Sequence, residues 1–233
     1  MNRKIGIICA GDREFEPFIK HIENDVVSEQ AMLKIHEGTI NGTEVVALYS
    51  GVCKVNAAIA TQILISSYEV EIVINAGTAG GMDERLDIFD TVISTEVAYH
   101  DVFPTILTEF HPWMETEYFK ADQKLIELSE IAVGKIKSCN NVVWGRMVTG
   151  EQFIAEEGRK EINDRYAPLI VDMETASIAH VCYVNKVPFI SIRCITDTAK
   201  HSGQGNFDKN CKKASGIAKD ITIALIDIIK KEF

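Results

Sequence analysis

Short apolar runs alternate with helical patterns along the whole chain, and this alternation limits the possible folds more than any other feature. The apolar runs are rich in β-branched residues, which is typical of strands buried in a sheet. Strands are predicted at residues 4–9, 32–40, 43–49, 72–75, 90–100, 142–149, 169–171 and 189–196, and helices at residues 54–67, 121–137, 156–166, 174–183 and 207–231. The alternation predicts an α/β fold in one domain over residues 1–233, with a central mixed β-sheet flanked by helices on both faces.

Turn residues place the connections between these elements. Asn41-Gly42 separates two β-rich runs and predicts a hairpin. Asp12 is expected to cap a helix that follows the first strand, with Pro17 near its first turn. A Gly-Thr-Ala-Gly-Gly turn is expected at residues 77–81, directly after a strand. Residues 101–118, with two prolines and no clean period, predict a long loop.

Composition excludes several classes of partner. The chain has 233 residues and a net charge of −10, so it lacks the basic surface that binds nucleic acid phosphates. No segment reaches the roughly 18 consecutive apolar residues of a membrane span. The basic and then apolar N-terminus is interpreted as a strand and not as a signal peptide. The six cysteines form no C-x-x-C pair, which predicts reduced thiols in a cytoplasmic protein.

Acidic side chains recur just past the predicted strands, where α/β folds bind their ligands. Glu14 follows the first strand, Glu174 follows the strand at 169–171, and Asp197 follows the strand at 189–196. Taken singly, each is an ordinary helix or turn acid. Arg193 is different, because an arginine within an apolar strand needs a buried partner. The glycine-rich turn matches neither the dinucleotide fingerprint nor the Walker phosphate loop.

Several runs at these strand ends occur together in one order and spacing. They are Ser-Gly-Val-Cys-Lys-Val-Asn-Ala-Ala from residue 50, Asn-Ala-Gly-Thr-Ala-Gly-Gly from residue 75, Thr-Gly-Glu-Gln-Phe-Ile from residue 149, Met-Glu-x-x-x-Ile-Ala-His-Val-Cys from residue 173, and Arg-x-Ile-Thr-Asp from residue 193. Over nearly its whole length the chain resembles the methylthioadenosine/S-adenosylhomocysteine nucleosidases, within the wider purine nucleoside phosphorylase superfamily.

The resemblance implies an enzyme that hydrolyses the bond between adenine and ribose in 5′-methylthioadenosine or S-adenosylhomocysteine. It implies that Glu14 activates the attacking water and that Asp197 protonates purine N7. Glu174 would bind the ribose hydroxyls, and Met173 would pack under the sugar. This is the two-carboxylate chemistry of glycosidases applied to a C–N bond. Asp197 must keep its proton, so burial beside other carboxylates is expected to raise its pKa.

The same resemblance implies the remaining parts of the site. The other predicted substrate-binding residues are Phe153 stacking on adenine, Ile154 reading the adenine edge through its backbone, Thr78 near the reaction centre, Arg193 orienting Glu174 or the water, Val52 and Phe207 lining the 5′ pocket, and Thr196 and Ala79. No metal or organic cofactor is implied. A homodimer is implied, in which the neighbour's loop after His100 closes the 5′ pocket.

The chain departs from the family pattern around the 5′ pocket. Gly11-Asp12-Arg13 replaces a methionine and two acids, Asp172 replaces a glutamate, and residues 103–106 differ from the usual acidic and aromatic run. The choice among methylthioadenosine, S-adenosylhomocysteine and 5′-deoxyadenosine therefore stays open, as does a nucleosidase acting on 6-amino-6-deoxyfutalosine.

Two other functions remain as alternatives. A phosphorolytic purine nucleoside phosphorylase needs positive charge around its phosphate. Phosphorylases usually carry an arginine where this chain has Asn75, and Glu14 would repel phosphate. A non-catalytic sensor of adenine nucleosides would have lost Glu14 or Asp197, and the chain has both.

Overall fold

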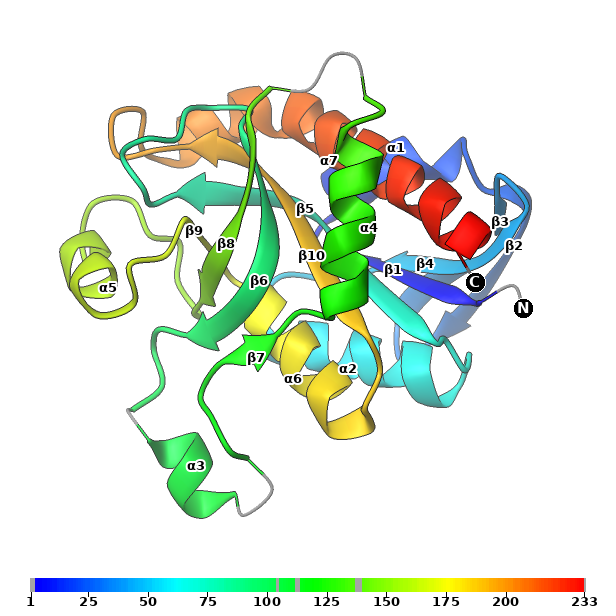
Figure 1. The fold of residues 1–233 in the computed structure, drawn as a ribbon, viewed down its shortest axis with the longest axis horizontal. Helices are drawn as coiled ribbons and strands as arrows, with labels where there is room; N and C mark the ends of the chain where they lie inside the picture. Colours follow the sequence, from blue (N-terminus) through cyan, green and yellow to red (C-terminus); the bar gives the residue numbers. More distant parts are fainter. Residues whose placement is uncertain (1–2, 104, 112–113, 137–139, 233) are drawn as a thin grey trace.

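The structure is a computed structural model that describes residues 3–103, 105–111, 114–136 and 140–232 (Figure 1). The described strands are β1 (Ile5–Cys9), β2 (Glu23–Gln30), β3 (Leu33–Ile40), β4 (Thr43–Tyr49), β5 (Ile72–Gly81), β6 (Thr91–Tyr99), β7 (Phe119–Lys120), β8 (Val142–Thr149), β9 (Ile170–Asp172) and β10 (Phe189–Asp197). The helices are α1 (Asp12–Ile19), α2 (Lys54–Ser66), α3 (Ile106–Phe110), α4 (Gln123–Val133), α5 (Arg159–Tyr166), α6 (Thr175–Asn185) and α7 (Gln204–Glu232).

One mixed sheet joins all of these strands, which confirms the predicted α/β fold. Its order is β10-β6-β8-β9-β5-β1-β4-β3-β2, and β7 pairs with β6. Strand β10 also pairs with β5, so the sheet closes on itself through β10, β6, β8, β9 and β5. Strands β10, β5, β1 and β4 are mutually parallel. Their carboxyl ends therefore meet along one edge, which is where the site forms.

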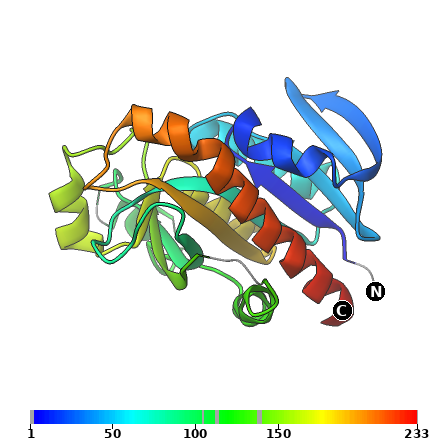
Figure 2. The same ribbon diagram turned by 90° about the horizontal axis from the view of Figure 1, so that it is seen from above.

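Helices cover both faces of the sheet, and each face has its own apolar core. On one face α7 crosses the sheet with α1 beside it, and α4 packs against α7 (Figure 2). Ile221, Leu225 and Ile228 of α7 are buried there and form the apolar face of this helix. On the other face α2 and α6 pack together through alanines and aliphatic side chains. None of the helices in the described parts of the chain has the length and apolar character needed to cross a membrane.

The predicted hairpin is confirmed. Strands β3 and β4 are antiparallel, and Asn41 and Gly42 between them both have positive φ, at 51° and 74°. Two positive φ angles in a two-residue loop fit the right-handed twist of the strands, which is why Asn-Gly is favoured there.

The predicted start of the first helix was wrong. Gly11 occupies the cap position, Asp12 is already helical, and Pro17 lies in the second turn. The N–H groups of Glu14 and Phe15, which a cap at Asp12 would bond, donate instead to the Gly11 carbonyl, at 3.2 and 3.1 Å. The Glu14 carboxylate stabilises this start of the helix by accepting the N–H groups of Ala10 and Gly11.

The expected turn at residues 77–81 was also wrong, because these residues are the second half of β5. Strand β10 pairs with β5 along this stretch, and that partner keeps the glycines extended. Gly77 is required for close approach: a Cβ there would lie 2.7 Å from both the Arg193 Nη1 atom and the Glu14 carboxyl group. The glycine run thus makes room for charged side chains beneath the site.

Several other elements also differ from the predictions. The edge strand β2 was not predicted, since seven of its eight residues are exposed and show no apolar alternation. Strand β7 and helix α3 are short elements within or beside the expected loop. The prolines of that loop, Pro104 and Pro112, lie outside the described residues. Asp197 ends β10 instead of opening the loop that follows.

Candidate active site

The carboxyl ends of β1, β4, β5, β9 and β10 surround a cavity of about 480 Å³. Eleven of the twelve predicted site residues line it: Glu14, Val52, Thr78, Ala79, Phe153, Ile154, Met173, Glu174, Thr196, Asp197 and Phe207. The twelfth, Arg193, is completely buried and lies outside the lining. Residues far apart in the sequence therefore meet in one place, as the strand-end argument predicted.

Glu14 is fixed by hydrogen bonds to both of its carboxyl oxygens. Oε2 accepts the backbone N–H of Ala10 at 2.8 Å and that of Gly11 at 3.4 Å. Oε1 accepts the backbone N–H of Thr78 at 2.7 Å and the Thr78 hydroxyl at 2.6 Å. Because three of these donors are backbone N–H groups, both oxygens must act as acceptors, the role that suits the ionised form.

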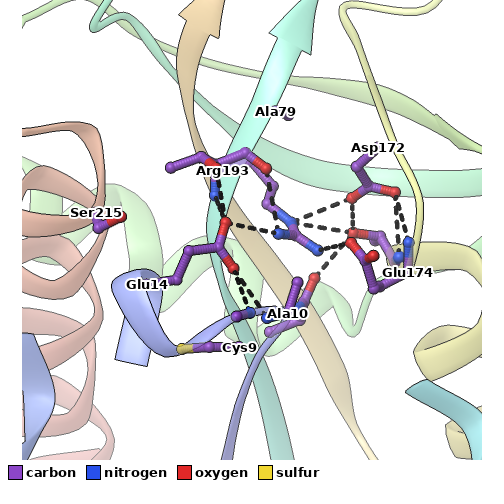
Figure 3. Close-up of polar contacts among 12 residues, drawn as sticks. Cys9, Ala10, Glu14, Ala79, Asp172, Glu174, Arg193 and Ser215 are labelled. Atoms are coloured by element: carbon purple, nitrogen blue, oxygen red, sulfur yellow. Dashed lines mark hydrogen bonds and ion pairs between the residues drawn. The ribbon is translucent and has the colours of Figure 1, made fainter. Parts of the chain in front are cut away.

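Arg193 lies at the centre of three buried carboxylates (Figure 3). Its guanidinium is 3.1 Å from Asp172 Oδ2, 3.5 Å from Glu174 Oε2 and 3.7 Å from Glu14 Oε1. A buried cation is stable only when paired, and here one cation serves acids from three elements. Arg193 thus lies beneath the cavity as a shared counter-ion, close to both Glu14 and Glu174.

Asp172 belongs to this cluster, although from the sequence it stood out only as a departure from the family pattern. Its Oδ1 accepts the Thr149 hydroxyl at 2.6 Å and the Thr175 backbone N–H at 3.1 Å. Its Oδ2 contacts Arg193 and the Thr175 hydroxyl. Its place beside Glu174 at the end of a strand was the signal that could have revealed it.

Glu174 faces the cavity from the cap of α6. Its Oε1 accepts the backbone N–H of Cys53 at 2.9 Å, so the loops after β4 and β9 are tied together at this carboxylate. Burial raises the pKa of Glu174, and the nearby Asp172 charge adds to the rise, while Arg193 and the Cys53 amide oppose it. With one carboxyl oxygen held by a main-chain donor, the group is positioned for hydrogen bonds to a polar ligand.

Asp197 has a contrasting environment at the end of β10. The pairing of β10 with β5 shifts between Ile195 and Asp197, and this bulge leaves Thr196 unmatched. The side chain of Asp197 is 1% exposed, and Oδ1 accepts the Thr196 hydroxyl at 2.9 Å. Oδ2 is buried and has no hydrogen-bond partner among the described residues.

Burial raises the pKa of Asp197, while the Thr196 hydrogen bond and the charge of Arg159 lower it in part. The expected contribution from neighbouring carboxylates was wrong, because the acidic cluster is concentrated around Arg193. Desolvation is the cause of the rise. A carboxyl group in this environment favours its protonated form, which can donate a hydrogen bond or a proton from the cavity wall.

Aromatic side chains also line the cavity. The rings of Phe153 and Phe207 meet edge to face with centroids 6.5 Å apart, and Phe153 is 42% exposed. Arg159, which sequence reasoning missed, is buried and donates to the carbonyl groups of Ala155, Ile154 and Gly81. It therefore fixes the loop that carries Phe153 and Ile154. Its position at the start of a polar helix gave no signal in the sequence.

The cavity thus combines an accepting carboxylate, a carboxyl group whose pKa is raised by burial, and apolar walls. Such a set can bind a small ring system and transfer protons to and from it. Within the described parts of the chain, no three His, Cys, Asp or Glu side chains are arranged to hold a metal ion.

Comparisons with known proteins agree with this geometry. The family model of the phosphorylase superfamily matches residues 4–227. A 5′-methylthioadenosine/S-adenosylhomocysteine nucleosidase of Bacillus subtilis (strain 168) is 35% identical over 231 residues, covering 96% of this chain and 98% of the relative.

Solved structures agree as well. A nucleosidase of the same name from Colwellia psychrerythraea 34H, in complex with adenine, superposes with a TM-score of 0.91 at 29% identity, covering 99% of this chain and 97% of that one. The Neisseria meningitidis nucleosidase, in complex with methylthio-immucillin-A, gives a TM-score of 0.89 at 31% identity over 98% and 99% of the two chains. The chain therefore belongs to the 5′-methylthioadenosine/S-adenosylhomocysteine nucleosidase family of the phosphorylase superfamily.

Proposed function

We propose that this chain hydrolyses the N-glycosidic bond of 5′-methylthioadenosine and S-adenosylhomocysteine and releases adenine. One observation carries the proposal: the cavity pairs Glu14, whose oxygens are acceptors, with Asp197, whose bare and buried Oδ2 favours a proton. An acid and a base held at separate positions of one cavity are what this hydrolysis needs.

Asp197 acts as the general acid. As the bond between the sugar C1′ and the adenine N9 breaks, its electron pair moves into the purine ring. Transfer of the Asp197 proton to N7 neutralises the charge that develops there. Phe153 stacks on adenine, and the backbone of Ile154, held by Arg159, reads its edge. Ala79 and Thr196 complete the wall on this side.

Glu14 acts as the general base. The departing adenine leaves a sugar with positive charge at C1′, and a water molecule attacks that carbon. Glu14 accepts the proton of this water while Thr78 and the main chain hold the carboxylate in place. Glu174 binds the ribose hydroxyls and Met173 packs under the ring, with Arg193 keeping the acidic cluster compact. Val52 and Phe207 line the 5′ side.

Water is favoured over phosphate as the nucleophile. Arg13 is the one cationic side chain among the described residues that line the cavity, and Arg193 is already surrounded by three carboxylates. Asn75, at the position where phosphorylases carry arginine, is buried in the sheet and bonded to the Ile8 carbonyl. A dianionic phosphate would therefore meet net negative charge at the reaction centre.

The proposal includes a homodimer. At one side of the molecule α2 and α6 lie together and α3 projects beyond the sheet (Figure 1). These helices and the segment before α3 carry exposed apolar side chains. They are Val55, Ile59, Phe103, Ile106, Phe110, Tyr183 and Val184. A patch of this kind favours association between copies. Light scattering on the purified protein should give twice the mass of one chain.

The deciding experiment follows free adenine and the sugar product with methylthioadenosine, S-adenosylhomocysteine and 5′-deoxyadenosine in turn. Each reaction is run in phosphate-free buffer and again with added inorganic phosphate. We expect adenine release at the same rate in both, with a free reducing sugar as the second product. A rate that depends on phosphate, with a sugar 1-phosphate as product, would indicate phosphorolysis. Nucleoside binding without adenine release would indicate a sensor.

A further inference from the structure

The order of the parallel strands gives the cavity a direction. Strand β10, which ends at Asp197, pairs with β5; β5 pairs with β1, and β1 pairs with β4. Gly11 follows β1 and Val52 follows β4, so these two residues bound the cavity on the side away from Asp197. With adenine at Asp197 and the ribose at Glu174, this is the side that the 5′ substituent enters.

Gly11 leaves space in the wall at this end, and neither its backbone nor its packing requires a glycine. Its φ of −130° and ψ of 167° are ordinary extended values that any residue adopts. A Cβ built on Gly11 has no heavy atom within 4 Å, whereas one on Gly77 would lie 2.7 Å from charged groups. The absent side chain of Gly11 therefore adds volume to the 5′ end of the cavity.

Arg13 lies at the rim of the cavity, two residues after Gly11 in the chain, and is half exposed. Its guanidinium is stacked 5.1 Å from the ring centre of Phe207, and Nη1 is 2.9 Å from Asp208 Oδ1. Both partners of this ion pair are about half exposed, at 49% and 52%. The other guanidinium N–H groups of Arg13 have no acceptor among the described residues. The rim thus presents a fixed positive group beside a negative one.

This pair is complementary to the end of an amino acid, in which a carboxylate and an ammonium group lie close together. We propose that the 5′ end of the cavity, lined by Gly11 and Arg13 and with Asp208 paired to Arg13 beside it, selects nucleosides whose 5′ chain is long and ends in an amino acid. Space at Gly11 admits the chain, Arg13 binds its carboxylate, and Asp208 faces its ammonium group. This inference rests on the proposed function and names S-adenosylhomocysteine as the preferred substrate over methylthioadenosine.

The test compares three nucleosides that differ only at the 5′ position: S-adenosylhomocysteine, 5′-butylthioadenosine and methylthioadenosine. Values of kcat/KM for adenine release are measured for the natural chain, Arg13→Gln, Gly11→Leu and the control Arg85→Gln. Arg85 is a surface arginine that is paired with Asp83 and lies away from the cavity. Ratios between substrates on the same variant cancel any general loss of folded enzyme.

Arg13→Gln should lower kcat/KM for S-adenosylhomocysteine about fivefold relative to butylthioadenosine, because a half-exposed charge contact is lost. Gly11→Leu should lower kcat/KM for both long substrates about tenfold relative to methylthioadenosine, because added methylenes fill the pocket. Arg85→Gln should leave all ratios unchanged. Gly11→Ala, a smaller change, should shift the ratios in the same direction by a lesser factor.

Two results would overturn this inference and leave the proposed function intact. One is an equal loss of kcat/KM for all three substrates in Gly11→Leu. The other is an equal loss of kcat/KM for the charged and uncharged long substrates in Arg13→Gln. A natural chain that releases adenine from none of the three nucleosides would instead overturn the proposed function, and this inference with it.

Discussion

Glu14 and Asp197 are two buried carboxyl groups that line the same cavity in opposite surroundings. Glu14 accepts four hydrogen bonds and lies 3.7 Å from a buried arginine. Asp197 accepts a single hydroxyl hydrogen bond, and its second oxygen is buried without a partner. The difference teaches that neighbours suit two identical groups to different chemistry: Glu14 is surrounded by donors and a counter-ion, whereas burial raises the pKa of Asp197.

The contrast comes from the backbone at each position. Glu14 is near the N-terminus of a helix, where unbonded N–H groups face a carboxylate, and the edge of β5 adds another donor. Asp197 follows a bulge in a strand whose N–H groups are used in pairing. Backbone N–H donors are available at the start of the helix but not at the end of the strand. Glu14 therefore suits the role of a base and Asp197 that of an acid.

The largest expected effect is on turnover. Asp197→Asn removes the proton donor and Glu14→Gln removes the proton acceptor, and each should lower kcat by about 10²–10⁴-fold. Adenine release under saturating substrate measures this, with circular dichroism to verify folding. Asp90→Asn is a matched control, since Asp90 is buried outside the cavity. Turnover close to that of the natural chain in either folded variant would remove that residue from the mechanism.

A second change tests the counter-ion on the Glu14 side. Arg193→Met leaves Glu14, Asp172 and Glu174 buried without a cation, so the free energy of unfolding should fall by about 3–5 kcal/mol. Urea denaturation at neutral pH measures the change. The surface variant Arg85→Gln should shift it by less than about 0.5 kcal/mol. Equal stability of Arg193→Met and the control would mean that the acidic cluster does not need its arginine.

The smallest effect concerns the Asp197 side and the pH dependence of activity. Asp197 must be protonated to act as the acid, so kcat/KM should fall as pH rises through its pKa. Burial raises that pKa and the charge of Arg159 lowers it. Arg159→Gln removes the opposing charge, so the alkaline fall in kcat/KM should begin at higher pH than in the natural chain.

The position of the alkaline limb separates this electrostatic effect from simple loosening of the Ile154 loop, which would lower kcat/KM equally at every pH. Profiles of kcat/KM across the neutral and alkaline range, with Arg85→Gln as the control, measure it. A shift of the limb to lower pH would contradict the assigned influence of Arg159 on Asp197.

Local sequence patterns predicted the strands that are buried along their apolar runs and the turn that needs a particular backbone conformation. The apolar runs of β1, β5 and β10 are fully buried, and the Asn41-Gly42 hairpin requires positive φ, so neighbouring residues carried the needed information. Strand β2 escaped prediction because its conformation depends on pairing with β3 and not on its own exposed side chains. The glycines of β5 are extended for the same reason, because β10 pairs with them.

The sequence by itself determined the α/β alternation, the strand-end positions of Glu14, Glu174 and Asp197, and the family motifs that connect them. Only the tertiary structure decided how these acids differ. It placed Arg193 among three carboxylates, brought Asp172 into that cluster, put a bulge before Asp197 and left Gly11 beside empty space. The physical reason is that charge state and available volume depend on burial and on partners from distant segments, and neither is written in the local sequence.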